Sequence, residues 1–123
     1  MASPKANSPG KWTTVASLEE LRKNSELAFA LPGPGGGQGF VVIWRGRCYA
    51  YRNRCCHHPL PLDFGDGRFL SRTGGTLRCQ NHGAEYAIPS GECVQGPCLG
   101  AFLESFPVRV EEDQVQIQLP QVD

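Results

Sequence analysis

Several short stretches of the chain alternate apolar and polar residues, the pattern typical of β-strands. The clearest example is the run 115–119, in which Val115, Ile117 and Leu119 would share one face. A second alternating run, Arg47–Tyr51, follows a turn at Arg45-Gly46. Together the patterns predict strands near residues 12–16, 27–31, 40–44, 47–51, 86–88, 92–94, 102–106, 108–110 and 115–119.

One short helix and several turns are predicted between these strands. Ser17-Leu18-Glu19-Glu20 is a capping-box pattern and predicts a helical turn to about Lys23. The glycine-rich stretch 32–39 lacks the Gly-Lys-Ser/Thr of a phosphate-binding loop, and a strand rather than a helix follows it, so we interpret it as a hairpin loop. Turn chemistry also marks residues 63–67, 74–75 and 89–91.

These elements predict an all-β fold of short antiparallel strands in a single domain over residues 12–120. Residues 1–11 are polar and are expected to form a disordered tail. The loop-rich part from about 53 to 100 would form a lobe inserted between the outer strands. No internal repeat is apparent.

Charge and hydropathy narrow the choice of function. The 12 basic residues balance the 12 acidic ones, so the composition gives no indication of a nucleic-acid partner. The charges are unevenly spread, because arginines gather between Arg45 and Arg78 while acidic residues dominate after Glu85. Without an apolar run of about 18 residues or a secretion signal, we expect no membrane association, a cytoplasmic location and reduced thiols.

The strongest chemical signal is a pair of short cysteine–histidine motifs. Cys55 and His57 form C-x-H, and Cys79 and His82 form C-x-x-H after an intervening loop of 21 residues (58–78). A tetrahedral zinc finger usually pairs cysteine with cysteine and histidine with histidine along the chain. Here each motif carries one cysteine and one histidine, which suits two metal ions that are ligated differently. We call the segment at Cys55 and His57 the first arm and the segment at Cys79 and His82 the second arm.

This arrangement resembles the Rieske [2Fe–2S] family, in which two cysteines hold one iron and two histidines hold the other. The residues that flank the family's two cluster loops and form its proline loop also have matches here, namely Pro61-Leu62, Gly83 and Gly96-Pro97. The resemblance covers residues 12–119. It implies a Rieske-like β-sandwich or barrel in which residues 53–100 form the cluster-binding lobe. The implied metal ligands are Cys55, His57, Cys79 and His82, with Tyr86 and Pro97 completing the cofactor site.

Adjacent cysteines and histidines leave a second register open. Cys56 and His58 also form C-x-H, but Leu62 lies at the family's usual distance from Cys55, so we favour Cys55 and His57. Cys56 and His58 are then interpreted as neighbours without a ligand role.

The resemblance also makes predictions about the residues around the cluster. High-potential members join their two loops by a disulfide, but Leu60 and Asn81 occupy the matching positions here. Such members also have a serine at the position of Ala84 and a tyrosine at that of Tyr86, both donating hydrogen bonds to sulfur. One donor lost and one kept indicates a low or intermediate reduction potential.

The remaining cysteines have simpler interpretations. Cys48 is expected to be a small core residue on a strand. Cys93 and Cys98 lie near the proline loop and would shield the cluster or pair with each other.

The resemblance implies a monomeric Rieske-type ferredoxin rather than an enzyme, carrying one electron from a reductase to a terminal oxygenase or other redox enzyme. One alternative is an accessory small subunit of a reductase such as nitrite reductase. Another is a redox sensor or a zinc-bound structural domain.

Overall fold

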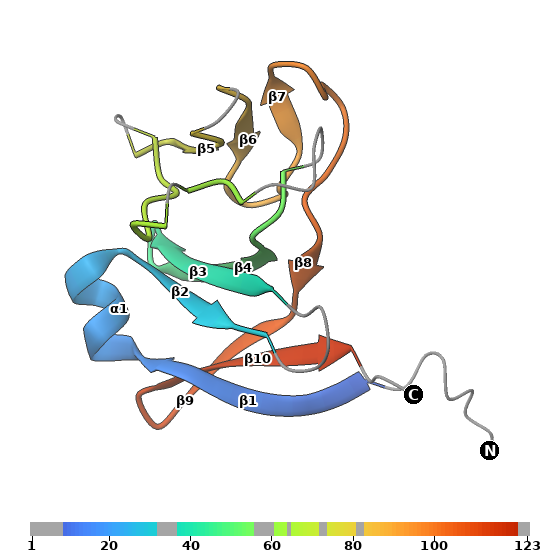
Figure 1. The fold of residues 1–123 in the computed structure, drawn as a ribbon. Coiled ribbons are helices and arrows are strands. Elements are labelled where there is room, and N and C mark those ends of the chain that lie inside the picture. Colours follow the sequence, from blue (N-terminus) through green and yellow to red (C-terminus); the bar gives the residue numbers. More distant parts are fainter. Residues whose placement is uncertain are drawn as a thin grey trace.

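The computed structural model describes residues 9–31, 37–55, 61–63, 65–71, 74–80 and 83–120. Its ordered elements are ten strands within these residues and one short helix (Figure 1). The strands are β1 (Pro9–Ser17), β2 (Glu26–Ala30), β3 (Gln38–Trp44), β4 (Arg47–Arg52), β5 (Thr76–Arg78), β6 (Glu85–Ala87), β7 (Cys93–Gln95), β8 (Ser105–Phe106), β9 (Val108–Glu111) and β10 (Gln114–Pro120). The helix is α1 (Leu18–Asn24).

The strands form three antiparallel sheets. One sheet has the order β1-β10-β9, the second β2-β3-β4-β8, and the third β5-β6-β7. The third sheet comes entirely from the middle of the chain and sits above the second in Figure 1, while both ends of the chain build the lower part. The all-β antiparallel fold predicted from the sequence is therefore confirmed.

The second sheet is a central layer with both faces buried. Along β3, Phe40, Val41 and Val42 have no exposed surface. Because successive side chains of a strand point to opposite faces, Phe40 and Val42 enter one core and Val41 enters the other. The first core lies toward the β5-β6-β7 lobe, and the second lies toward α1, β9 and β10.

The helix follows the predicted capping pattern. The Ser17 hydroxyl accepts a hydrogen bond from the Glu20 N–H at 3.0 Å, and Leu21 packs into the second core. Ser25 ends the helix in the left-handed conformation with φ 72°. At seven residues, α1 is far too short to cross a membrane, and none of the described residues forms a helix that is long and apolar enough to do so.

Two sequence-based boundaries need correction. Pro9, Gly10 and Lys11 belong to β1, although the sequence analysis placed them in the tail. The predicted strand 102–106 is reduced to the two residues of β8. This segment crosses from the lobe to the central sheet, and its backbone bonds divide between the two, with the Leu103 N–H donating to Gly91 O.

Tyr51 connects the central sheet to the lobe. Its hydroxyl donates a hydrogen bond of 2.5 Å to the carbonyl of Ile88, in the turn between β6 and β7. Gly91 lies against the same ring, since a Cβ there would lie 2.7 Å from Tyr51 Cε1, and its φ of 76° also favours glycine. Burial, with a smaller contribution from Tyr49, raises the pKa of Tyr51 to about 12.

We expect Tyr51→Phe to lower the free energy of unfolding at neutral pH by about 1–3 kcal/mol, because the buried Ile88 carbonyl loses its donor. Below pH 10 both folded and unfolded Tyr51 are protonated. Between about pH 10 and 12 the unfolded chain loses this proton first, so the stabilising effect of Tyr51 falls as pH rises. Denaturant titrations across this range should show the advantage of the wild type over the variant shrinking. An advantage that is constant from pH 9 to 12 would contradict this account.

We also expect the cluster-free protein to keep its outer sheets but to lose order from about residue 53 to 100. Much of this span is loop, and free energy of metal binding becomes free energy of folding where the unfolded chain holds no preformed site. Hydrogen exchange on cluster-free protein would show fast exchange there and slow exchange in β1, β3 and β10. Uniform protection along the chain would contradict the prediction.

Candidate metal centre

Two buried cysteine side chains lie in the core of the lobe. Cys55 and Cys79 are 2% and 0% exposed and belong to the same core. Cys55 follows the end of β4, and Cys79 directly follows β5. Sulfurs from two distant segments are thus enclosed in one apolar core.

A buried polar network shapes the first arm. The Asn53 side chain donates to Asp63 Oδ1 at 3.0 Å and accepts from the Leu62 N–H at 2.7 Å. The other oxygen of Asp63 accepts from the Gly67 N–H at 2.9 Å. Asn53 and Asp63 are the only buried polar residues among those described, and their bonds tie the end of β4 to the segment that returns after the arm.

The second arm is a tight loop fixed to the first. The Cys79 N–H donates to Ala84 O and the Gly83 N–H donates to Cys79 O, both at 2.8 Å. Gly83 has a φ of 73°, a conformation that glycine adopts without strain. The Gln80 N–H donates to Leu62 O at 2.7 Å, so a backbone hydrogen bond joins the second arm to the segment that follows the first.

Tyr86 lies beneath the first arm. Its side chain is fully buried on β6, and its hydroxyl is 3.3 Å from Cys55 Sγ and 3.5 Å from Cys98 Sγ. When Cys55 is a thiolate it can only accept, so the hydroxyl would donate to it. The structure therefore places Tyr86 against one predicted ligand.

The loop Gly96–Gly100 covers Ala84. A Cβ on Gly96 would lie 2.8 Å from the Cα of Ala84, which has no exposed surface. Gly100 and Ala101 close the loop by donating to the carbonyls of Cys93 and Cys98. Pro97 lies in this loop with an exposed side chain, and its contact with a cofactor stays a prediction.

The other described cysteines are not equivalent. Cys93 is buried and free, and its sulfur contacts that of Cys98 at 3.7 Å. Cys98 is disulfide-bonded, although not to Cys93, so the pairing considered for these two cysteines is not formed and not every thiol is reduced. Cys48 packs against the second core, and burial raises the pKa of its thiol despite the opposing charge of Arg22. Cys48 therefore remains a protonated packing residue.

The predicted histidine ligands His57 and His82 lie outside the described residues, as do Cys56 and His58. The ligand set and its register are therefore still predictions. Of the four predicted ligands, the structure describes the two cysteines. Two buried cysteines with a hydroxyl beside one of them fit the donor set of an iron–sulfur cluster, in which thiolates bind iron and accept hydrogen bonds.

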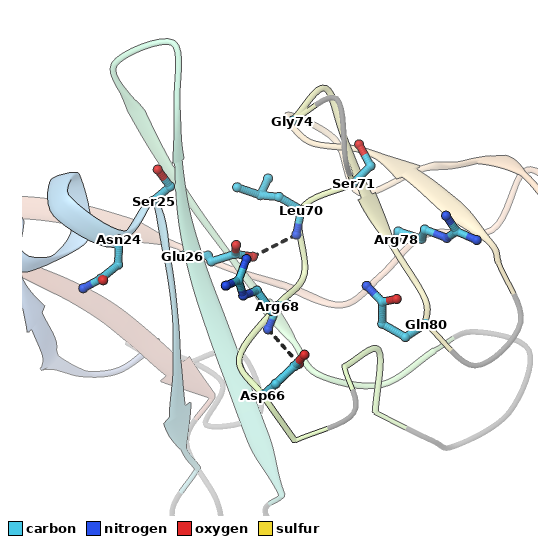
Figure 2. A pocket seen from close by; sticks show the side chains of 10 residues that line it. All are labelled: Asn24, Ser25, Glu26, Asp66, Arg68, Leu70, Ser71, Gly74, Arg78 and Gln80. Carbon is cyan, nitrogen blue, oxygen red and sulfur yellow. Dashed lines mark hydrogen bonds between the residues drawn. The ribbon is translucent and has the colours of Figure 1, made fainter.

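A polar hollow of about 670 Å³ separates the lobe from α1 and β2 (Figure 2). Across it, one oxygen of the Glu26 carboxylate accepts from the N–H groups of Phe69 and Leu70, at 2.5 and 2.8 Å. This role of Glu26 could not be predicted from the sequence, because the residue is far from the lobe along the chain. The lining residues are Asn24, Ser25, Glu26, Asp66, Arg68, Leu70, Ser71, Gly74, Arg78 and Gln80.

Comparison with known proteins agrees with the chemistry of the site. Residues 11–110 match the family described as Rieske [2Fe-2S] domain. Oxidoreductase NdmD of Pseudomonas putida is 33% identical over 109 residues, a match that covers 80% of this chain and 17% of that protein. The chain spans about a sixth or less of the length of the curated relatives it matches.

Solved structures share the fold at lower identity. The ferredoxin of carbazole 1,9a-dioxygenase from Nocardioides aromaticivorans IC177 is 22% identical with a TM-score of 0.67, covering 90% of this chain and 97% of that one. The terminal oxygenase from the same source is 21% identical with a TM-score of 0.75, covering 97% of this chain and 33% of that one. The same fold thus occurs both as a small ferredoxin and as one part of a larger oxygenase.

The ligand register can be tested by four substitutions. We expect Cys55→Ser and His57→Ala to abolish binding of the cluster, whereas Cys56→Ser and His58→Ala should retain it. The visible spectrum and the iron and sulfide content of the purified proteins measure the outcome. If the second pair loses its colour and the first pair keeps it, the ligands are Cys56 and His58.

Proposed function

The chain belongs to the Rieske [2Fe–2S] domain family, and from this premise we propose that it carries single electrons from a reductase to a terminal oxygenase. The observation that carries the proposal is the burial of Cys55 and Cys79 in one core, with the Tyr86 hydroxyl 3.3 Å from the sulfur of Cys55. A [2Fe–2S] cluster is the cofactor that the family and this donor set imply.

The proposed roles follow from ligand chemistry. Cys55 and Cys79 would hold one iron as thiolates, and His57 and His82 would hold the other through neutral imidazoles. When bound, the cluster takes up and releases one electron. Two ferric ions, two sulfides and two thiolates have no net charge, so adding an electron costs less than for a four-cysteine cluster. Tyr86 would lower this cost further by donating to the sulfur of Cys55.

Oxygen activation is assigned to the partner. A non-haem oxygenase site needs two histidines and a carboxylate on a second iron. The chain contains three histidines, and once His57 and His82 bind the cluster only His58 is left. Electron delivery is therefore the chemistry that these residues support.

The named relatives favour an oxygenase as acceptor. Both carbazole 1,9a-dioxygenase components described above have this fold, and NdmD is named an oxidoreductase. None of them favours a nitrite reductase subunit or a zinc-bound domain. Three further points stay predictions. They are that the domain acts as a carrier and not as an enzyme, that it is a monomer, and that it is cytoplasmic.

Electron paramagnetic resonance with metal analysis tests the proposal. The reduced protein should show a signal whose average g-value lies below that of the free electron, with two irons, two sulfides and no zinc per chain. Reduced protein mixed with an oxidised Rieske oxygenase should become oxidised as the acceptor gains an equal number of electrons, which the visible spectra of the two separated proteins would show. Stoichiometric zinc without iron would overturn the proposal.

A single added hydroxyl should raise the reduction potential. Ala84 is buried beside Gly96, and its carbonyl is bonded to the N–H of Cys79. In Ala84→Ser the new hydroxyl can donate to a sulfur of the cluster, which stabilises the reduced state. Redox titration monitored by circular dichroism should therefore show a higher midpoint potential than in the wild type.

Ala87→Ser provides the matched control, because it adds the same hydroxyl on β6 at a half-buried position outside both cores. It should leave the potential unchanged. An unchanged or lower potential in Ala84→Ser would mean that position 84 does not face the cluster.

A further inference from the structure

Two exposed arginines directly precede the two buried cysteines. Arg54 precedes Cys55, and Arg78 precedes Cys79. In both arms the arginine is exposed and the cysteine is buried. Arg78 is the last residue of strand β5, where neighbouring side chains point in opposite directions. Each arm therefore encloses a sulfur while it holds a positive charge at the surface one residue away.

Neither guanidinium is neutralised by an ion pair within the described part of the chain. The ion pairs found there involve other arginines, namely Arg52 with Glu104 and Arg109 with Glu111. Ion pairing between Arg54 or Arg78 and a neighbour therefore does not explain these exposed charges.

Arg78 lies against the second arm itself. Its Nη2 is 3.9 Å from the point where a Cβ on Gly83 would lie, and Gly83 directly follows the predicted ligand His82. Figure 2 shows the side chain extending away from Glu26. Glu85 pairs with Arg78 across the β5–β6 ladder, but its carboxylate accepts from the Thr76 hydroxyl at 2.7 Å.

Three exposed apolar side chains come from the segment that carries the loop over Ala84. Val94, Leu99 and Phe102 are 48%, 70% and 59% exposed, and they lie in or beside the loop Gly96–Gly100 that covers Ala84. Large apolar side chains gathered next to a functional site are typical of a surface that a partner covers. Arginine is also enriched at such surfaces.

We propose that Arg54, Arg78, Val94, Leu99 and Phe102 form a docking face for the redox partner, and that this partner presents acidic side chains around an apolar centre. The inference rests on the proposed function and adds the chemistry of the surface that must be recognised. Because the chain has no net formal charge, attraction depends on local charges rather than on the charge of the whole molecule.

Small redox ions can test the local charge without the partner. The reduced protein passes one electron to ferricyanide, which becomes ferrocyanide, and stopped-flow absorbance gives the second-order rate. We expect the wild-type rate to fall as salt is added, since salt screens attraction between the anion and the arginines. Arg54→Glu and Arg78→Glu should each lower the low-salt rate by about tenfold, near the lower end of the range for electrostatic steering. A cationic cobalt(III) ammine complex should show the opposite trend.

Arg22→Glu is the matched control, with the same change in net charge. Arg22 is exposed on α1, and its charge acts to lower the pKa of Cys48. Cys48 packs on the opposite side of the central sheet from Cys55. Its effect on either rate should be much smaller. The midpoint potential of each variant is measured as well, so that its electron-transfer rate can be corrected for any change in driving force.

Equal effects of Arg22→Glu and the two arm variants would overturn the docking face. So would a wild-type ferricyanide rate that rises with salt. The paramagnetic resonance spectrum of the same samples tests the cluster independently, so the docking face can fail while the proposed function stands.

Discussion

The metal centre depends on holding two separate arms of the chain against each other. Cys55 and Cys79 can face one cofactor only if their arms are fixed in relative position, and the hydrogen bond from the Gln80 N–H to Leu62 O does this directly. The Asn53–Asp63 network sets the position of Leu62 in turn. Each bond contributes only about 1 kcal/mol net. We therefore expect cluster binding to supply part of the free energy that orders these loops.

The central sheet supplies the rigid part of the site. One face packs against the core of the lobe and the other against the core beneath α1, so β3 and β4 are packed on both faces. Tyr51 extends from this sheet to Ile88, and Glu26 extends from its edge strand to Phe69 and Leu70. A cofactor that exchanges electrons benefits from such a frame, because a site supported by sheet residues keeps its geometry better than one built on loops alone.

Local patterns predicted most of the fold, and tertiary contacts account for what they missed. The alternation of β10, the capping box of α1 and the two cysteine motifs are each readable within a few residues. The short β8 could not be read from Phe102–Phe106, because that segment divides its backbone bonds between two sheets. The link from Glu26 to the lobe depends on a contact between distant parts of the chain, which no local pattern encodes. Burial of Cys55 and Cys79 was implied by their proposed role, but the packing of Tyr86 between Cys55 and Cys98 required the structure.

Mössbauer spectroscopy of the ⁵⁷Fe-loaded protein tests the central claim most directly, because it distinguishes irons that have different ligands. If Cys55 and Cys79 hold one iron and the two arm histidines hold the other, the oxidised protein must show two ferric sites of equal intensity. On reduction, the added electron should reside on the histidine-bound iron, leaving a ferric site with sulfur ligands. Two irons with indistinguishable all-sulfur surroundings, or a single mononuclear iron, would contradict the account.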